Sequence, residues 1–468
     1  MSITSKLTRL GAAGAGGGAT PWALRISNTN VSNYDGVYPG ASALAADNAN
    51  GVYAGMYENI NDYTLTFRVD QDGLPVWRLK HRNSIGRIST RPSLSAGSSG
   101  FPNDLFGAGY YNGNQLGYRI NSSGVVQASD DFWGDNYNDA VICSHPNVSF
   151  VYASVFKNGA FKVERLNASN MTRASSGSNN ADNSRLYTLA ASTTFYLNGP
   201  ASKLVHFPTS NTHNVYVPLL RVGSQGLISS LGNGTFNYKF VNYSGRNTNP
   251  NYNDAAIGNG YYEGGVSKFK YYMTATTTLL HEFTVDSNLN ANGAQYAWTT
   301  SGGTSAVVRS VAEDSSGNRY FNFSGRTVIK VNASNVVEWG IQITLSGVNS
   351  TSEDNGNLVV SSDEDAVYLM LSSRAGATNT GATYIVKIPA DGGIAPGTYA
   401  DPATSGSYAN LSYVISDVSG NLTPRAYALN SVTTASATAG VSVSADLGAD
   451  SLVASTQAPF NDESLTEF

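Results

Sequence analysis

A short polar corner that recurs along the chain is the feature that most constrains its fold. In the clearest copies an apolar residue is followed by Asp or Asn, then two small or polar residues, then Gly or Asn, as in Val69-Asp70-Gln71-Asp72-Gly73. The apolar residues of successive corners are Ile26, Val69, Ile120, Leu166, Phe207, Val241, Val285, Val331 and Ile388. Their mean spacing of roughly 45 positions is typical of one four-stranded blade of a β-propeller.

Two regularities around the corner strengthen this interpretation. A basic residue often stands just before the apolar one, as Arg68 and Lys330 do, and a Trp follows the corner at matching positions, Trp77 and Trp339. Single copies of such a turn occur in any all-β protein rich in Gly and Asn, including a sandwich. Seven or more copies in order favour a propeller.

The composition agrees with a fold made of sheets and tight turns. Charged residues make up 13% of the chain, against roughly 25% in an ordinary globular protein. The 48 Gly and 28 Tyr suit turns and pleated strands, whereas solvated helices need more Glu, Lys and Arg. We therefore expect an all-β fold with very little helix.

The sequence divides into three parts. Residues 1–20 form a Gly-rich leader, residues 21–395 a β-propeller of seven or eight four-stranded blades, and residues 396–468 an extended arm rich in Ser, Thr and Ala. We expect the first and last strands of the propeller to complete one blade together. For the arm two interpretations remain open: a disordered linker, or an extended segment that adds strands to a neighbour.

Several classes of function are disfavoured. The net charge is −5 and no Lys/Arg run interleaves with aromatic residues, which argues against nucleic acid as a partner. The single Cys143 excludes an intrachain disulfide and a zinc site built from cysteines. No run of about 18 apolar residues is present, and the N-terminal segment lacks the apolar core of a signal peptide. We expect no membrane insertion and synthesis in a host cytoplasm.

Searches for catalytic and metal-binding motifs find none that is complete. His281-Glu282 begins like a zinc-protease motif, but Val285 stands where the second His belongs. Asp363-Glu364-Asp365 is the densest carboxylate cluster; a cation site or an acid/base pair is one interpretation, and a solvated hairpin turn before a strand is the favoured one. We predict no catalytic residue, no metal site and no cofactor.

Five residues are candidates for surface or glycan contact. Tyr137 and Asp139 lie in a segment, Asn136 to Ile142, that is echoed later in the chain by Asn251 to Ile257, which contains Tyr252 and Asp254. Trp133 follows two acidic residues and a Phe. Aromatic rings beside Asn and Asp offer a flat apolar face with polar groups, which suits glycans and proteins. Ordinary strand packing is the favoured explanation of such residues.

The segment from Asp314 to Tyr320, continued from Val328 to Trp339, resembles the seven-bladed β-propeller repeat family, with Asn335 where Gly is typical. The layout of the whole chain is similar to that of propeller proteins from marine bacteriophages. Those proteins share the Gly-rich start, a last blade ending as Lys387 to Gly392 does, and a Ser/Thr/Ala-rich tail. The resemblance implies a structural protein of the virion without catalytic residues.

We accordingly expect a bacteriophage virion structural protein, a component of the tail or tail tip, on the exterior of the particle. Its expected partners are other virion structural proteins and copies of itself, with a host surface glycan as a further candidate. The alternatives are a glycan-binding surface propeller that acts as a receptor-binding protein, and a capsid decoration or head fibre. A depolymerase enzyme is disfavoured because no carboxylate pair stands out.

Overall fold

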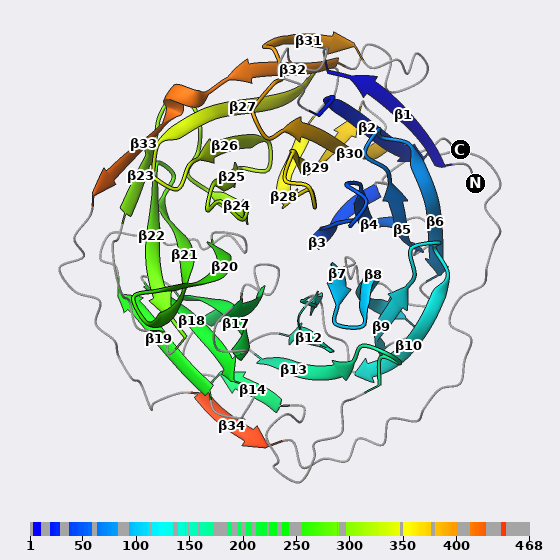
Figure 1. Ribbon diagram of the computed structural model, residues 1–468, viewed down its shortest axis with the longest axis vertical. Helices are drawn as coiled ribbons and strands as arrows, with labels where there is room; N and C mark the ends of the chain where they lie inside the picture. The colour runs from blue at the N-terminus through cyan, green and yellow to red at the C-terminus, as the bar shows by residue number, and fades with distance from the viewer. Residues whose placement is uncertain are drawn as a thin grey trace.

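The chain forms a ring of β-sheets around a central axis, as the computed structural model shows (Figure 1). The structure describes residues 3–10, 19–28, 37–58, 63–82, 93–111, 114–133, 139–145, 147, 149–157, 160–172, 185–189, 195–197, 203–207, 212–221, 224–231, 236–242, 255–287, 289, 296–346, 350–375, 380–400, 412–426 and 441–445. Apart from a 3-10 turn, η3 (Ser419–Asn421), all its regular elements are strands. The all-β propeller expected from the corner repeat is confirmed.

Two sheets occupy the right-hand part of the ring in Figure 1. The closing sheet contains, in spatial order, β1 (Ile3–Arg9), β2 (Trp22–Asn28), β30 (Thr380–Pro389), β29 (Ala366–Ala375) and β28 (Ser350–Val360). The eight-stranded sheet contains β10 (Val126–Trp133), β9 (Asn114–Ile120), β8 (Phe101–Tyr111), β7 (Ser93–Ser98), β3 (Val37–Ala46), β4 (Val52–Glu58), β5 (Tyr63–Val69) and β6 (Pro75–Arg82).

Four further sheets complete the ring. The β11 sheet contains β11 (Asp139–Cys143), β12 (Phe150–Lys157), β13 (Ala160–Asn167), β14 (Arg185–Leu189) and β34 (Val441–Ala445). The β17 sheet contains β15 (Phe195–Leu197), β17 (Thr212–Arg221), β18 (Ser224–Leu231) and β19 (Phe236–Asn242), with β16 (Lys203–Phe207) also on β17. The β20 sheet contains β20 (Ala255–Glu263), β21 (Val266–Thr276), β22 (Leu279–Asp286), β23 (Tyr296–Thr300) and β33 (Leu422–Ala426). The β24 sheet contains β24 (Val308–Glu313), β25 (Arg319–Phe323), β26 (Thr327–Val331), β27 (Val337–Ser346), β32 (Ser412–Asp417) and β31 (Gly397–Ala400).

The described residues thus form six sheets, and the seven or eight separate blades expected from the repeat are not what the structure shows. The difference arises in the eight-stranded sheet. There the meanders β3–β6 and β7–β10 are joined by one parallel bridge between Ser42 and Ser93. The corner repeat marks a hairpin within a sheet, and nothing in it reports where the inner strands of neighbouring meanders pair.

Both ends of the chain contribute to the ring. In the closing sheet β2 pairs antiparallel with β30, with Trp22 opposite Lys387, so the first and last strands complete one sheet as expected. The leader supplies β1, which pairs with β2. The arm supplies β31 to β34, which lie on the outer side of the β24, β20 and β11 sheets. The sheets of the propeller therefore extend beyond residues 21–395.

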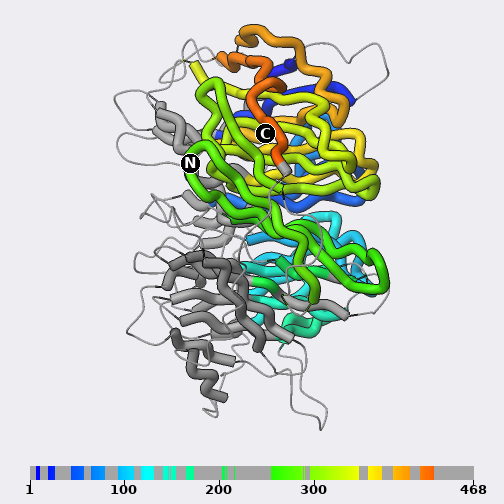
Figure 2. The backbone as a smooth tube through the Cα atoms, turned by 90° about the vertical axis from the view of Figure 1, so that its left-hand side faces the viewer, coloured from blue at the N-terminus to red at the C-terminus, as the bar shows by residue number. Residues whose placement is uncertain are grey.

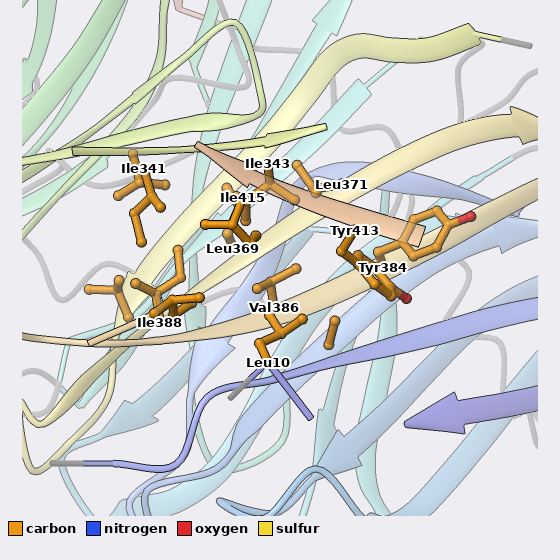
Figure 3. Packing of buried hydrophobic residues seen from close by; sticks show 14 of the residues in the cluster. Leu10, Ile341, Ile343, Leu369, Leu371, Tyr384, Val386, Ile388, Tyr413 and Ile415 are labelled. Atoms are coloured by element: carbon orange, nitrogen blue, oxygen red, sulfur yellow. The ribbon is translucent and has the colours of Figure 1, made fainter. Parts of the chain in front are cut away.

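Apolar side chains fill the spaces between neighbouring sheets. One core cluster, shown in Figure 3, packs Ile341 and Ile343 of β27 against Leu369 of β29. Leu10 of the leader and Ile415 of the arm are buried in the same cluster. In the side view of Figure 2 the orange arm strands lie over the green and yellow strands. Burial of a Leu or Ile side chain contributes about 1.5–3 kcal/mol, so both terminal segments stabilise the fold.

The corner repeat has a local explanation. The Oδ1 atom of the Asp or Asn accepts the backbone N–H groups two and four residues later, at 2.8–3.0 Å, in the corners of Asp70, Asn121 and Asn332. The fourth residue has a left-handed backbone, with φ of +82° at Gly124 and +64° at Asn335. Gly and Asn adopt this conformation at the lowest cost, which explains the pattern of residue types.

The basic residue and the Trp have a second role, which we call the corner latch. They lie directly opposite each other on two paired strands, and both donate a hydrogen bond to one backbone carbonyl in the corner of the next meander, at 2.9–3.2 Å. The three latches are Trp22 and Lys387 on Gln71, Trp77 and Arg68 on Ser122, and Trp339 and Lys330 on Ala390. The repeat seen in the sequence is therefore also the contact that joins one meander to the next.

Candidate functional site

The five residues predicted to make surface or glycan contacts fall at the edge of the described chain. Trp133 ends β10 and Asp139 begins β11, and only their backbone is described. Tyr137, Tyr252 and Asp254 lie outside the described residues. The echo that pointed to them has a structural explanation, because β11 and β20 each begin their own sheet at its inner end (Figure 1).

A buried ionic cluster joins the β20 sheet to the β24 sheet. Glu282 of β22 is fully buried and accepts hydrogen bonds from Arg319 Nη1 at 2.6 and 2.7 Å. Trp298 Nε1 donates to the same carboxylate at 2.9 Å, and Lys270 Nζ lies 3.1 Å from it. Glu282 belongs to the His281-Glu282 pair that resembles the start of a zinc motif, and its carboxylate serves this ion pair. A buried carboxylate needs such partners.

A second polar cluster lies on the inner strands β16, β20 and β24. Glu313, the last residue of β24, accepts a hydrogen bond from Tyr272 Oη at 3.1 Å and one from the backbone N–H of Asn259. A register shift between Ile257 and Gly260 forms a bulge in β20, which turns this N–H toward the carboxylate. A Cβ atom at Gly258 would clash with Glu313 Oε1, so a larger residue there would displace the carboxylate from this position.

Lys203 of β16 extends this inner cluster to a third sheet. Its Nζ donates to Asn259 Oδ1 at 2.7 Å and to the Ile257 carbonyl at 3.3 Å. Desolvation lowers the pKa of Lys203, and the charge of Glu313 opposes this shift. Desolvation raises the pKa of the nearby Cys143 thiol to about 11, so the thiol is neutral at pH 7. A neutral thiol is a poor nucleophile.

The electrostatics of the two clusters indicate a structural role. Desolvation and the charges of Glu313 and Glu282 raise the pKa of Tyr272 well above its usual value, so its hydroxyl stays protonated and donates. The carboxylates of Glu313 and Glu282 each accept from donors of their own chain. These donors come from neighbouring strands and sheets, so each cluster ties parts of the ring together. Sequence analysis missed both, because the residues in contact lie 12 to 56 positions apart in the sequence.

The carboxylate-rich segment Asp363 to Asp365 forms the turn between β28 and β29, as the favoured interpretation states. Asp363 Oδ1 accepts from Ser361 Oγ at 2.6 Å and from the backbone N–H of Asp365 at 3.1 Å. Glu364 accepts from the N–H and hydroxyl of Ser315, both at 2.7 Å. Within the described part of the chain, no group of three His, Cys, Asp or Glu residues is placed to hold a metal ion.

One surface of the ring presents apolar side chains at a repeated position. Leu74, Val125 and Val336 each follow the left-handed residue of a corner and are 55%, 55% and 56% exposed. Val76 is also exposed, next to the half-buried Trp77. The three corners that carry Leu74, Val125 and Val336 join β5 to β6, β9 to β10 and β26 to β27, the last two strands of each meander, so they lie on the same face of the ring. We call Leu74, Val76, Val125 and Val336 the corner face. Single exposed aliphatic residues are common, whereas their recurrence at one structural position indicates a contact surface.

The hairpin between β20 and β21 carries a second exposed surface. Tyr262 and Val266 are exposed, while Tyr261 is half-buried, as expected for neighbouring residues of one strand. The turn is Gly264-Gly265, and Cβ atoms placed there would meet no atom within 4 Å. Tyr262, Val266 and the two glycines are called the hairpin tip.

Among the described residues, no helix is long and apolar enough to cross a lipid bilayer.

Comparison with known proteins gave structural likenesses but no family. No family model matches the chain, and no curated protein matches it. Among solved structures, the chain is similar to the propeller of Dos1, at 9% identity and a TM-score of 0.43, over 74% of this chain and 94% of that one. It is also similar to the polysaccharide lyase Uly1, at 11% identity and a TM-score of 0.40, over 78% and 93% of the two chains. Likenesses of this extent carry no conclusion about activity.

Proposed function

We propose that the protein is a structural binding protein of a bacteriophage particle, located in the tail region, and that it acts by contact and not by catalysis. Its partners are other virion structural proteins and copies of the chain. The observation that carries the proposal is the corner face, where the same corner position exposes an aliphatic side chain in three meanders.

The free energy that the corner face would gain on being covered fits an assembly contact. Full burial of a Leu or Val side chain contributes about 1.5–3 kcal/mol, so covering the exposed half contributes roughly 1 kcal/mol per residue. Each contact is modest, and a ring that presents several of them gains from their number. The low charge of the chain favours hydrogen-bonded, hydrated contacts around this apolar centre.

The absence of catalysis is part of the proposal and is supported by how the acidic groups are used. Glu282, Glu313, Asp363 and Glu364 each accept hydrogen bonds from their own chain. A catalytic acid or base must instead reach a substrate. Incubation with bacterial surface polysaccharides should release no new reducing or unsaturated ends. Asp131 is one of the two acidic residues that precede Phe132 and Trp133, the group most similar in the sequence to a glycosidase site. Release of such ends, and its loss in Asp131→Ala, would establish a depolymerase instead.

The test of the structural role uses a triple variant, Leu74→Ser/Val125→Ser/Val336→Ser. Phage particles assembled with this variant in place of the unmodified chain are purified, and the protein is quantified by mass spectrometry. We expect incorporation to fall at least tenfold, while circular dichroism and urea unfolding of the free protein stay unchanged. Val266→Ser, also at an exposed valine, is the matched control and should incorporate normally. Normal incorporation of the triple variant, or absence of the chain from particles, would refute the proposal.

Glycan binding is the second candidate, favoured by Tyr262 at the hairpin tip. An exposed aromatic ring beside polar groups suits stacking on a sugar. A glycan array with the isolated protein should then show binding that Tyr262→Ala abolishes and Val266→Ala retains.

A capsid decoration or head fibre is distinguished from a tail protein by where the ring lies in the particle.

A further inference from the structure

The exposed charges of the described residues are segregated by sign. The sequence has 33 acidic and 28 basic residues, so the whole chain is nearly balanced. Among the side chains whose exposure the structure gives, the fully exposed acidic ones are Asp72, Glu263, Glu338, Asp363, Asp365, Asp391 and Asp417. The exposed basic ones are Arg9 and Arg425, on the outermost strands β1 and β33. A surface that is merely solvated mixes both signs, so this excess of acid needs a reason.

Two of these carboxylates stand beside the aliphatic side chains of the corner face. Asp72 precedes Leu74 by two residues in one corner, and Glu338 follows Val336 by two residues in another. The third corner, that of Val125, has the neutral residues Ser and Gln at the two matching places. Two of the three corners therefore present an exposed aliphatic side chain and an exposed carboxylate together.

The closing sheet adds three carboxylates at one of its ends. Asp363 and Asp365 lie in the turn between β28 and β29, and Asp391 follows the end of β30. These three strands pair antiparallel in succession, so the turn and the end of β30 lie at the same end of the sheet. The Asp365 carbonyl accepts the N–H of Ala390 at 2.8 Å, which brings the two segments into contact.

The corner latch explains why the acids near Asp72 have no exposed cation for each of them. Lys387, the basic residue of this latch, is 6% exposed and donates to the latch carbonyl at 2.9 Å. Desolvation lowers the pKa of Lys387, and three carboxylates oppose this shift: Asp363, Asp72 and Asp365. Arg9 acts in the same sense as desolvation, so two bases, one of them buried, stand against three exposed acids.

The corner of Asp391 repeats this arrangement. Lys330 donates to the latch carbonyl beside Asp391 at 3.1 Å, and it also pairs with Glu338 at 3.0 Å. Within the described part of the chain, Asp391 itself forms no ion pair, and neither do Asp72 and Asp365. The latches turn the basic residues of the corners inward and leave the acidic residues facing outward.

This charge distribution limits what can cover the corner face. A second copy that docked through the same face would oppose like charges across a two-fold axis, which disfavours the pair. Covering the aliphatic side chains also removes water from the carboxylates beside them. A carboxylate that loses its water needs a cation or a hydrogen-bond donor in exchange.

We propose that the corner face binds a basic surface of a different virion protein, on which Lys or Arg side chains border apolar ones. This inference rests on the proposed function and names the chemistry of the partner. The cations of the partner pair with Asp72, Asp365 and Asp391, while its apolar side chains cover Leu74 and Val336. Such charge complementarity sets specificity and the rate of association more than affinity.

Particle assembly with charge-neutral variants tests the proposal. The variant Asp72→Asn/Asp365→Asn removes two carboxylates of the corner face. The matched control Glu263→Gln/Asp417→Asn makes the same change in net charge at the hairpin between β20 and β21 and on the outer strand β32. Incorporation into particles, measured by mass spectrometry, should fall on the order of tenfold in the first variant and stay unchanged in the control. Urea unfolding of both free proteins should match that of the unmodified chain.

Several results would overturn the proposal. Normal incorporation of Asp72→Asn/Asp365→Asn would show that the partner is not basic, and equal losses in both variants would show that net charge alone matters. Release of the chain from particles by EDTA would show that a divalent cation bridges two acidic surfaces. Carbodiimide cross-linking condenses a carboxylate with an amine to an amide and releases water; in particles that mix light and heavy chains, amides from these carboxylates to a second copy would identify that copy as the partner.

The failure of this inference and the failure of the proposed function are distinguishable. If Leu74→Ser/Val125→Ser/Val336→Ser is lost from particles while Asp72→Asn/Asp365→Asn incorporates normally, the corner face is a contact surface whose partner is not basic. If the chain is absent from particles, or the serine variant incorporates normally, the proposed function itself fails.

Discussion

Replacement of Gly124 by Ala tests the corner latch most sharply. Gly124 has φ of +82°, and a Cβ atom built on it would lie 2.7 Å from Cγ and 2.8 Å from Cδ2 of Trp77. A left-handed backbone costs about 1–2 kcal/mol once a Cβ is present. Displacement of the packed ring adds about 1–3 kcal/mol. The lost hydrogen bond from Trp77 Nε1 to Ser122, 3.0 Å long, adds about 1 kcal/mol. The expected loss, summed from these contributions, is about 3–6 kcal/mol.

Gly100→Ala is the matched control. Its φ is +87°, and no atom lies within 4 Å of the added Cβ, so it should lose only the backbone cost of about 1–2 kcal/mol. Both variants are measured by urea unfolding followed by circular dichroism. In a Trp77→Ala background the ring is gone, and Gly124→Ala should then cost no more than Gly100→Ala does. Equal losses for Gly124→Ala and Gly100→Ala in the unmodified background would refute the latch.

Three further predictions concern buried ionisable groups. Glu282→Gln leaves the buried Arg319 without its carboxylate partner. The free energy of unfolding, measured with urea, should fall by about 3–5 kcal/mol. A loss below about 1 kcal/mol would contradict the role of this ion pair. Burial lowers the pKa of His281 to about 4, so protonation favours the unfolded chain. The free energy of unfolding should therefore fall by roughly 3 kcal/mol as the pH is lowered from about 6.5 to about 4. In His281→Gln the urea midpoint should depend less on pH over this range. Burial raises the pKa of Cys143 to about 11, so a maleimide at pH 7 should modify the unfolded chain and leave the native one unmodified; rapid native modification would show that the thiol is accessible.

The parts of the fold that sequence could predict are those set by local chemistry. The turn at Asn121 needs an acceptor side chain and a left-handed residue within four positions, and both are visible in the sequence. In two of the latches the Trp and the basic residue are also local, because they face each other across one hairpin, as Trp77 and Arg68 do. In the third latch Trp22 and Lys387 come from opposite ends of the chain. For Trp77 and Arg68, only the acceptor, the Ser122 carbonyl of the next meander, required the structure.

What sequence could not predict depends on pairing between distant segments. Alternation in Val441–Ala445 indicates a strand, but nothing in it specifies β14 as the partner. The bridge between Ser42 and Ser93 joins two meanders through residues without any distinguishing pattern. The same holds for the site, since Glu313 and Lys203 belong to no motif, and only the bulge in β20 brings Asn259 between them.

The measurement that tests the proposed function most directly is the cryo-electron microscopy density of an intact particle whose proteins include this chain. The account expects a ring of β-sheets in the tail region, with Leu74, Val125 and Val336 buried against a neighbouring subunit. A particle in which the ring is present but these three side chains face solvent, or in which no such ring exists, would contradict it.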